Sequence, residues 1–121
     1  MHMSQTYSIE QALIEWLEGM GYDAYSNVPK DRPDEFVTVE RTGGYVEDMV
    51  DHPVIAIQTW SQSAASAEKG ASDIRMAAIL GDVPDGVHSM RVNSGPYKFY
   101  DEESMQPRYQ TVYDVACQLV I

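Results

Sequence analysis

The C-terminal segment, Arg108 to Ile121, places the strongest constraint on the fold, because its side chains alternate in character along the chain. One face carries Tyr109, Thr111, Tyr113, Val115, Cys117, Leu119 and Ile121, and the other carries Gln110, Asp114 and Gln118. A period of two is typical of a β-strand with one buried face. Fully extended, the segment spans more than ~40 Å at about 3.3 Å per residue, whereas a domain of this length has a radius of gyration of roughly 14 Å. The strand must therefore bend, carry a bulge or project beyond the body.

Two helices are predicted elsewhere in the chain. Apolar residues recur at helical spacing from Ile9 to Met20, and Ser8 followed by Gln11 fits a capping box. The second predicted helix runs from Ser63 to Leu80 and presents a stripe that is nearly all alanine. Alanine permits close approach but buries little area, and Gly70 weakens this helix by about 1 kcal/mol relative to alanine. The second helix therefore needs a partner surface.

The remaining segments alternate or carry β-branched residues, which is typical of strands. Strands are predicted over Tyr22–Val28, Phe36–Arg41, Val54–Ile57, Val87–Val92, Pro96–Tyr100 and the C-terminal segment, with a turn at Thr42–Gly44 and an irregular acidic segment at Tyr45–Pro53. The apolar run Val54–Ile57 is expected at the sheet centre, covered on both faces. Together these elements predict an α/β (α+β) fold, with a single mixed or antiparallel sheet of about five to six strands packed by two helices. One domain is expected over residues 4–121, and Met1 to Met3 are interpreted as an expression remnant.

Charge excludes several classes of partner. Lys and Arg total 8 against 19 Asp and Glu, which gives a formal net charge of -11. Such a field repels nucleic acid and anionic membrane surfaces, and no apolar run approaches the ~20 residues of a membrane span. Identical subunits would repel one another too, so any oligomer is expected to depend weakly on salt or Mg²⁺. The single cysteine excludes an intrachain disulfide and favours a reducing cytosol.

No residue pattern indicates catalysis, a cofactor or a metal centre, and the chain is predicted not to be an enzyme. Gly19, Gly21 and Ala24 fit a dinucleotide-binding pattern, but they follow a helix where that motif requires a strand. The acidic stretch from Glu47 to His52 has no cation-loop spacing. Cys117 shares its face with apolar residues and is expected to be a small core residue.

The aromatic residues favour contact surfaces. Eight tyrosines and two tryptophans stand against two phenylalanines, a bias that is common at protein interfaces and also in half-buried strands. The candidate contact segments are residues 43–52 and 97–109. The candidate interface residues are Tyr45, Glu47, Asp48, Asp51, Tyr97, Tyr100, Arg108 and Tyr109.

The order of elements and the final strand, in which Arg108 to Val115 read RYQTVYDV, resemble the tail terminator proteins of long-tailed bacteriophages. The resemblance implies a small α/β protein that forms a ring, usually hexameric. Such a ring caps the tail tube, ends its polymerisation and presents a surface that joins tail to head. The implied partners are copies of the chain, the major tail tube protein and a head completion or connector protein. The implied location is the host bacterial cytoplasm during assembly and then the virion tail.

Beside a small hydrolase that would use His52 or His88, two other functions remain open at the level of sequence. One is a different head–tail joining protein, such as a neck or head completion component that binds the portal. The other is a small bacterial ligand-binding module in which the sheet and helices enclose a pocket.

Overall fold

The computed structural model describes residues 7–100 and 103–119, with only the backbone for residues 99 and 100. The predicted remnant Met1–Met3, the loop residues Asp101 and Glu102, and Ile121 lie outside the described residues. In chain order the elements are α1 (Ile9–Gly19), β1 (Ala24–Tyr25), β2 (Phe36–Glu47), β3 (Val50–Trp60), α2 (Ala64–Ile79), β4 (Val87–Tyr100) and β5 (Pro107–Gln118). Two helices and a five-stranded sheet confirm the predicted α+β class.

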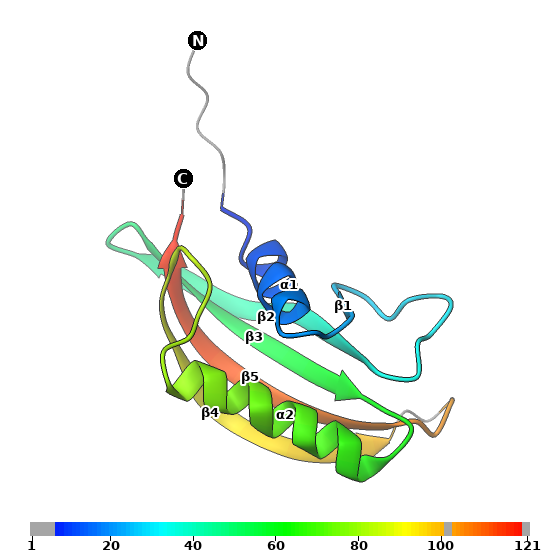
Figure 1. Cartoon of the computed structure of the whole chain (residues 1–121). Helices are drawn as coiled ribbons and strands as arrows, with labels where there is room; N and C mark the ends of the chain where they lie inside the picture. Colours follow the sequence, from blue (N-terminus) through cyan, green and yellow to red (C-terminus); the bar gives the residue numbers. More distant parts are fainter. Residues whose placement is uncertain (1–6, 101–102, 120–121) are drawn as a thin grey trace.

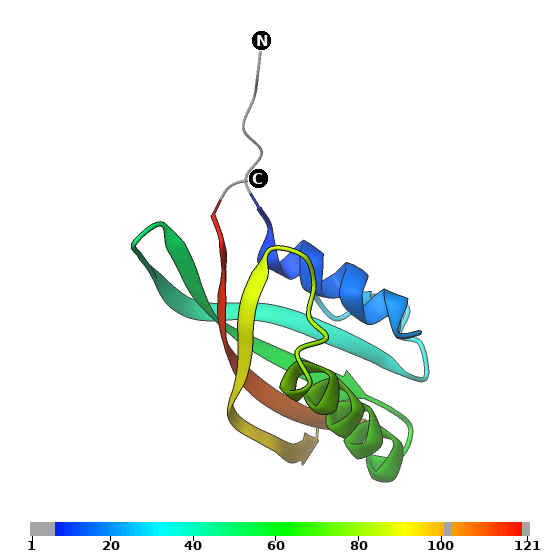
Figure 2. The same cartoon turned by 60° about the vertical axis from the view of Figure 1, so that its left-hand side comes forward.

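The strands form one mixed sheet in the order β1-β2-β3-β5-β4. The short strand β1 runs parallel to β2, and the other neighbours are antiparallel. Both helices lie on the same face of the sheet, with α1 near β1 and β2 and with α2 over β4 and β5 (Figures 1 and 2). The opposite face, called the helix-free face below, carries neither of them.

The core fills the space between the helices and the sheet. Helix α1 contributes Ile9, Leu13 and Leu17, α2 contributes Ile74 and Ala78, and the sheet contributes Val37, Val39, Ile55, Ile57, Tyr113, Val115 and Cys117. The predicted burial of Cys117 is confirmed, because its side chain is fully enclosed. Strand β3 is central, as the apolar run Val54–Ile57 predicts, and Ile55 to Ile57 are buried.

Both predicted helices are present with serine N-caps. The Ser8 and Ser63 hydroxyls accept hydrogen bonds from the backbone N–H groups of Gln11 and Ser66. Only half of the predicted capping box forms, since the Gln11 side chain donates to Glu15 instead. The alanine stripe of α2 packs toward the sheet, as its small side chains allow.

Several predicted strand and turn boundaries are wrong. The segment Tyr22–Val28 contains only the two residues of β1, because its other residues enter a loop. The predicted turn at Thr42–Gly44 is a bulge within β2, which continues to Glu47 and pairs with β3 from Val50 onward. The segment Tyr45–Pro53, predicted to be irregular, therefore belongs to these two strands except for the turn residues Asp48 and Met49. The segments predicted as two strands before the acidic loop form the single strand β4.

The long final strand is accommodated by curvature of the sheet. Strand β5 spans Pro107–Gln118, and the sheet bends along it (Figure 1). Its neighbour β4 shifts register at three places, between Val87 and Ser89, Val92 and Ser94, and Ser94 and Tyr97. Bulges increase local twist and bend. The bulges that the length of the last segment requires therefore lie in its partner strand.

Candidate functional site

A β-hairpin formed by the ends of β2 and β3 projects from the body of the sheet (Figure 2). We call residues 43–50 the arm. Residues 41–49 are all exposed, including three large apolar side chains. Tyr45 is 59%, Val46 57% and Met49 77% exposed. This concentration of exposed apolar side chains on one hairpin makes the arm a candidate contact surface.

The turn of the arm is tight, and its two central residues are uncommon at such turns. Asp48 and Met49 have φ angles of 51° and 64°, in the left-handed region that a two-residue hairpin turn requires. Aspartate tolerates this region, whereas for an ordinary L-residue such as methionine it costs about 1–2 kcal/mol. The turn thus places an acidic and a mostly exposed apolar side chain together at the tip.

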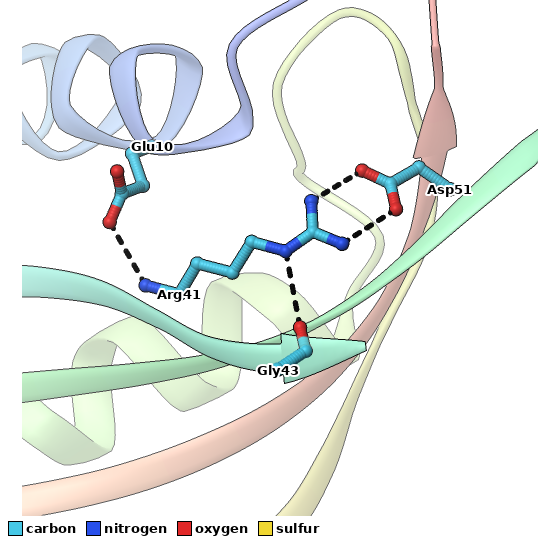
Figure 3. A network of polar contacts seen from close by, with 4 residues as sticks. All are labelled: Glu10, Arg41, Gly43 and Asp51. Carbon is cyan, nitrogen blue, oxygen red and sulfur yellow. Dashed lines mark hydrogen bonds and ion pairs between the residues drawn. The ribbon is translucent and has the colours of Figure 1, made fainter. Parts of the chain in front are cut away.

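An arginine fixes the base of the arm (Figure 3). The Arg41 guanidinium binds Asp51 through two parallel contacts, Nη1–Oδ2 at 2.6 Å and Nη2–Oδ1 at 2.8 Å, and its Nε donates to the Gly43 carbonyl at 3.1 Å. The Arg41 backbone N–H donates to the Glu10 carboxylate at 2.9 Å, which ties β2 to α1. Hydrogen bonding to Asp51 raises the pKa of Arg41. Bidentate pairs of this kind fix the relative orientation of the two side chains and also strengthen their interaction.

Close backbone packing adds to the rigidity of the arm. Gly44 has a φ of 128°, and a Cβ atom there would lie 2.3 Å from the His52 carbonyl oxygen. Beside it the Tyr45 and His52 rings stack with centroids 4.7 Å apart. These contacts restrain the base of the arm, which lowers the conformational entropy lost on docking.

A row of polar side chains crosses the helix-free face. Thr38, Gln58, Gln110 and Tyr97 stand directly opposite one another on β2, β3, β5 and β4. Thr38 donates to Gln58 at 3.4 Å, Gln58 donates to Gln110 at 2.7 Å, and Gln110 donates to the Tyr97 hydroxyl. This polar ladder allows the face to contact solvent, so the face needs no covering layer of helices.

An aromatic cluster lies at one end of the helix-free face, beside the ladder. The Phe36 and Trp60 rings stack at 5.2 Å, and the Arg108 guanidinium lies 4.7 Å from the Trp60 ring centroid. The Arg108 Nη1 also donates to Gln58 at 3.5 Å. This arrangement combines cation–π contact with a hydrogen bond, so Arg108 is part of the face itself.

The predicted interface residues fall into separate groups. Tyr45, Glu47 and Asp48 lie on the arm, while Asp51 at its base is 8% exposed and paired with Arg41. Tyr97 and Arg108 lie on the helix-free face, whereas Tyr109 stands opposite Thr59 in register and so faces the helices. The side chain of Tyr100 lies outside the described residues.

The metal-ligating and thiol side chains of the described residues are scattered or buried. Within residues 7–100 and 103–119, no three His, Cys, Asp or Glu side chains are grouped to hold a metal ion. Burial raises the pKa of the Cys117 thiol to about 11, which keeps it protonated at neutral pH. Two hollows on the helix-free face, of about 440 and 470 Å³, are open to solvent. These features suit macromolecular contact better than an enclosed small molecule.

Sequence reasoning missed the ladder and the Arg41 pair. Thr38, Gln58 and Gln110 each occupy the polar phase of an alternating strand, which is a usable signal once the strand register is known. Arg41 gives no such signal, because its partner Asp51 reads as one acid among several in a solvated loop.

Comparison with models of known protein families finds no match, and a search of curated proteins finds no significant match. None of the helices among the described residues is long and apolar enough to cross a membrane.

Proposed function

We propose that this chain is the subunit of a homo-oligomeric ring that caps the tail tube of a long-tailed phage, ends its polymerisation and joins tail to head. The observation that supports this proposal most is the arm: a rigid, exposed hairpin with apolar side chains at the margin of a sheet whose second face has no helix. The resemblance of RYQTVYDV in β5 and of the element order to tail terminator proteins gives the proposal its biological setting.

The arm offers enough apolar surface to contribute to docking. Complete burial of a side chain such as Val or Met is worth about 1.5–3 kcal/mol, and tyrosine adds a large ring with a polar tip. Tyr45, Val46 and Met49 are each more than half exposed, so most of that stabilisation is still available to a partner. A preorganised arm loses little conformational entropy when it binds.

Ring closure requires a head-to-tail contact, in which two different surfaces of the same subunit meet. A projecting arm and a separate sheet surface provide two such surfaces. The net charge of -11 opposes the packing of identical copies. Divalent cations and added salt reduce this repulsion, so the ring is expected to form more readily with Mg²⁺.

Light scattering coupled to size exclusion, with and without Mg²⁺, tests the proposal. We expect hexamers, or a salt-dependent mixture of monomer and hexamer. A chain that stays monomeric at high concentration with Mg²⁺ would contradict the ring and favour the ligand-binding module.

Partner choice distinguishes a terminator from other joining proteins. Added to polymerising tail tube protein, the oligomer is expected to stop tube growth at one end. Binding to the portal, with no effect on tube growth, would instead identify a neck or head completion component.

A further inference from the structure

The arm and the edge strand β4 differ in the sign of their charge. The arm contains Glu47 and Asp48 and no Lys or Arg. Strand β4 contains Arg91 and Lys98 and no Asp or Glu, in a chain that has 19 acidic residues and 8 basic ones. A strand without a carboxylate therefore stands out against the overall acidity.

The two elements border the same hollow on the helix-free face, which is lined by Tyr45 of the arm and by Arg91 of β4. Strand β4 is the edge of the order β1-β2-β3-β5-β4, and the arm grows from β2 and β3 across β5 from it. The tip of the arm and the β4 side of this hollow are different surfaces of the subunit, as a head-to-tail contact requires.

Arg91 is exposed and available for such a contact. It stands opposite Asp114 on the helix-free face, where Asn93 donates to both Asp114 carboxylate oxygens, at 3.3 and 3.1 Å. Among the described residues, no ion pair involves Arg91. In a chain of net charge -11, an exposed cation without an internal partner fits an external carboxylate.

We infer that the arm of one copy docks along β4 of the next copy, with Glu47 and Asp48 facing Arg91. This inference rests on the proposed ring and names the contact that closes it. An aromatic side chain accompanies Arg91 on the helix-free face, where Tyr97 of β4 is 42% exposed.

The contact is made by side chains and does not extend the sheet. Regular strand addition needs an edge with an unbroken row of backbone groups. Strand β4 shifts register three times and contains Pro96, which has no N–H to donate. Its edge therefore cannot form a long backbone ladder, and specificity comes from charge and apolar contact.

A reciprocal charge exchange tests the inference. One variant, Glu47→Lys with Asp48→Lys, reverses the charge of the arm, and another, Arg91→Glu, reverses the charge on the receiving face of β4. Each variant by itself is expected to lose the oligomer in light scattering, because like charges meet at every contact. An equimolar mixture is expected to regain it, because subunits that alternate around the ring restore opposite charges. Glu15→Lys with Glu18→Lys on α1, and Lys30→Glu, are controls of matched charge at exposed positions and are expected to assemble normally.

The outcomes separate the inference from the proposed function. If wild-type protein assembles and the reversed variants assemble equally well, or if the folded variants fail to recover on mixing, the arm–β4 contact is wrong while the ring stands. If wild-type protein is monomeric, the ring itself is wrong. Circular dichroism melting confirms that each variant is folded.

Discussion

Gly43 and Gly44 are adjacent in sequence but stand in different surroundings. A Cβ at Gly44 would lie 2.3 Å from the His52 carbonyl oxygen and 2.7 Å from the Pro53 Cα, and its φ of 128° disfavours any L side chain. At Gly43 nothing lies within 4 Å of the same atom. The approach of β2 to β3 at the base of the arm thus depends on one of the two glycines.

Gly44→Ala is expected to destabilise the chain by about 1–3 kcal/mol. The alanine either keeps a strained positive φ or forces β2 and β3 apart at the base of the arm. Gly43→Ala is the control and is expected to stay within about 0.5 kcal/mol of the parent. Denaturant unfolding measures both, and equal stability of the two variants would contradict the packing described for the arm.

Arg41→Ala is expected to cost about 1–3 kcal/mol, because it leaves the Asp51 carboxylate without its partner. The side chains of Arg41 and Asp51 are 36% and 12% exposed, so solvent screening keeps the loss below that of a fully buried pair. Arg41→Lys keeps the charge but not the two parallel contacts. Its unfolding free energy should therefore lie between those of the wild-type protein and Arg41→Ala. A midpoint of urea unfolding unchanged by Arg41→Ala would show that the pair does not hold the arm.

Cys117 is expected to resist thiol reagents in the native state and to react once the chain unfolds, because its side chain is fully buried. Burial, followed by the nearby Asp51 charge, raises its pKa from 9.0 to about 11. A raised folded-state pKa contributes stability below about pH 9 that is lost as pH rises toward 11. Cys117→Ala should remove this part of the alkaline decline in unfolding free energy. Rapid labelling of folded protein would contradict the assignment.

At the level of elements, α2 carries a glycine that its packing does not need. A Cβ at Gly70 would meet Thr59 Cγ2 at 3.5 Å and Tyr22 Cε1 at 3.6 Å, which are ordinary contacts. Gly70→Ala is therefore expected to stabilise the chain by about 0.5–1 kcal/mol through helix propensity. Thermal unfolding measures the change, and a lower melting temperature would mean that α2 packs more tightly on the sheet than these distances indicate.

The helices were predictable because their signals are local. Ser8 and Ser63 cap α1 and α2, and the apolar spacing that follows each cap needs no knowledge of the rest of the fold. The hairpin was missed because Gly43 and Gly44 suggest a turn, whereas the chain turns at Asp48 and Met49, which carry a weaker turn signal.

The surfaces of the sheet were only partly predictable. Tyr45, Glu47 and Asp48 were predicted as contact residues from composition and position, and all three are exposed on the arm. The ladder of Gln58 and Gln110 depends on pairing between distant segments, which a single sequence does not give. Long-range register is set by tertiary packing, so no local pattern could place these side chains together.

The charge of the whole molecule is unevenly distributed, and in the proposed ring this distribution decides how readily subunits assemble. Repulsion from the net charge of -11 acts between entire subunits, whereas attraction between the arm and β4 acts only where the two surfaces meet. Weak assembly that depends on Mg²⁺ is the expected balance, since cations screen the general repulsion and the apolar contacts of the arm remain.

Electron micrographs of the wild-type protein in Mg²⁺ show directly whether the chain assembles into rings. Averaged images are expected to show closed rings with rotational symmetry and a central opening, built from one kind of contact between neighbours. Isolated monomers, dimers with two-fold symmetry or open filaments would contradict the account, because none of them arises from a head-to-tail contact that closes on itself.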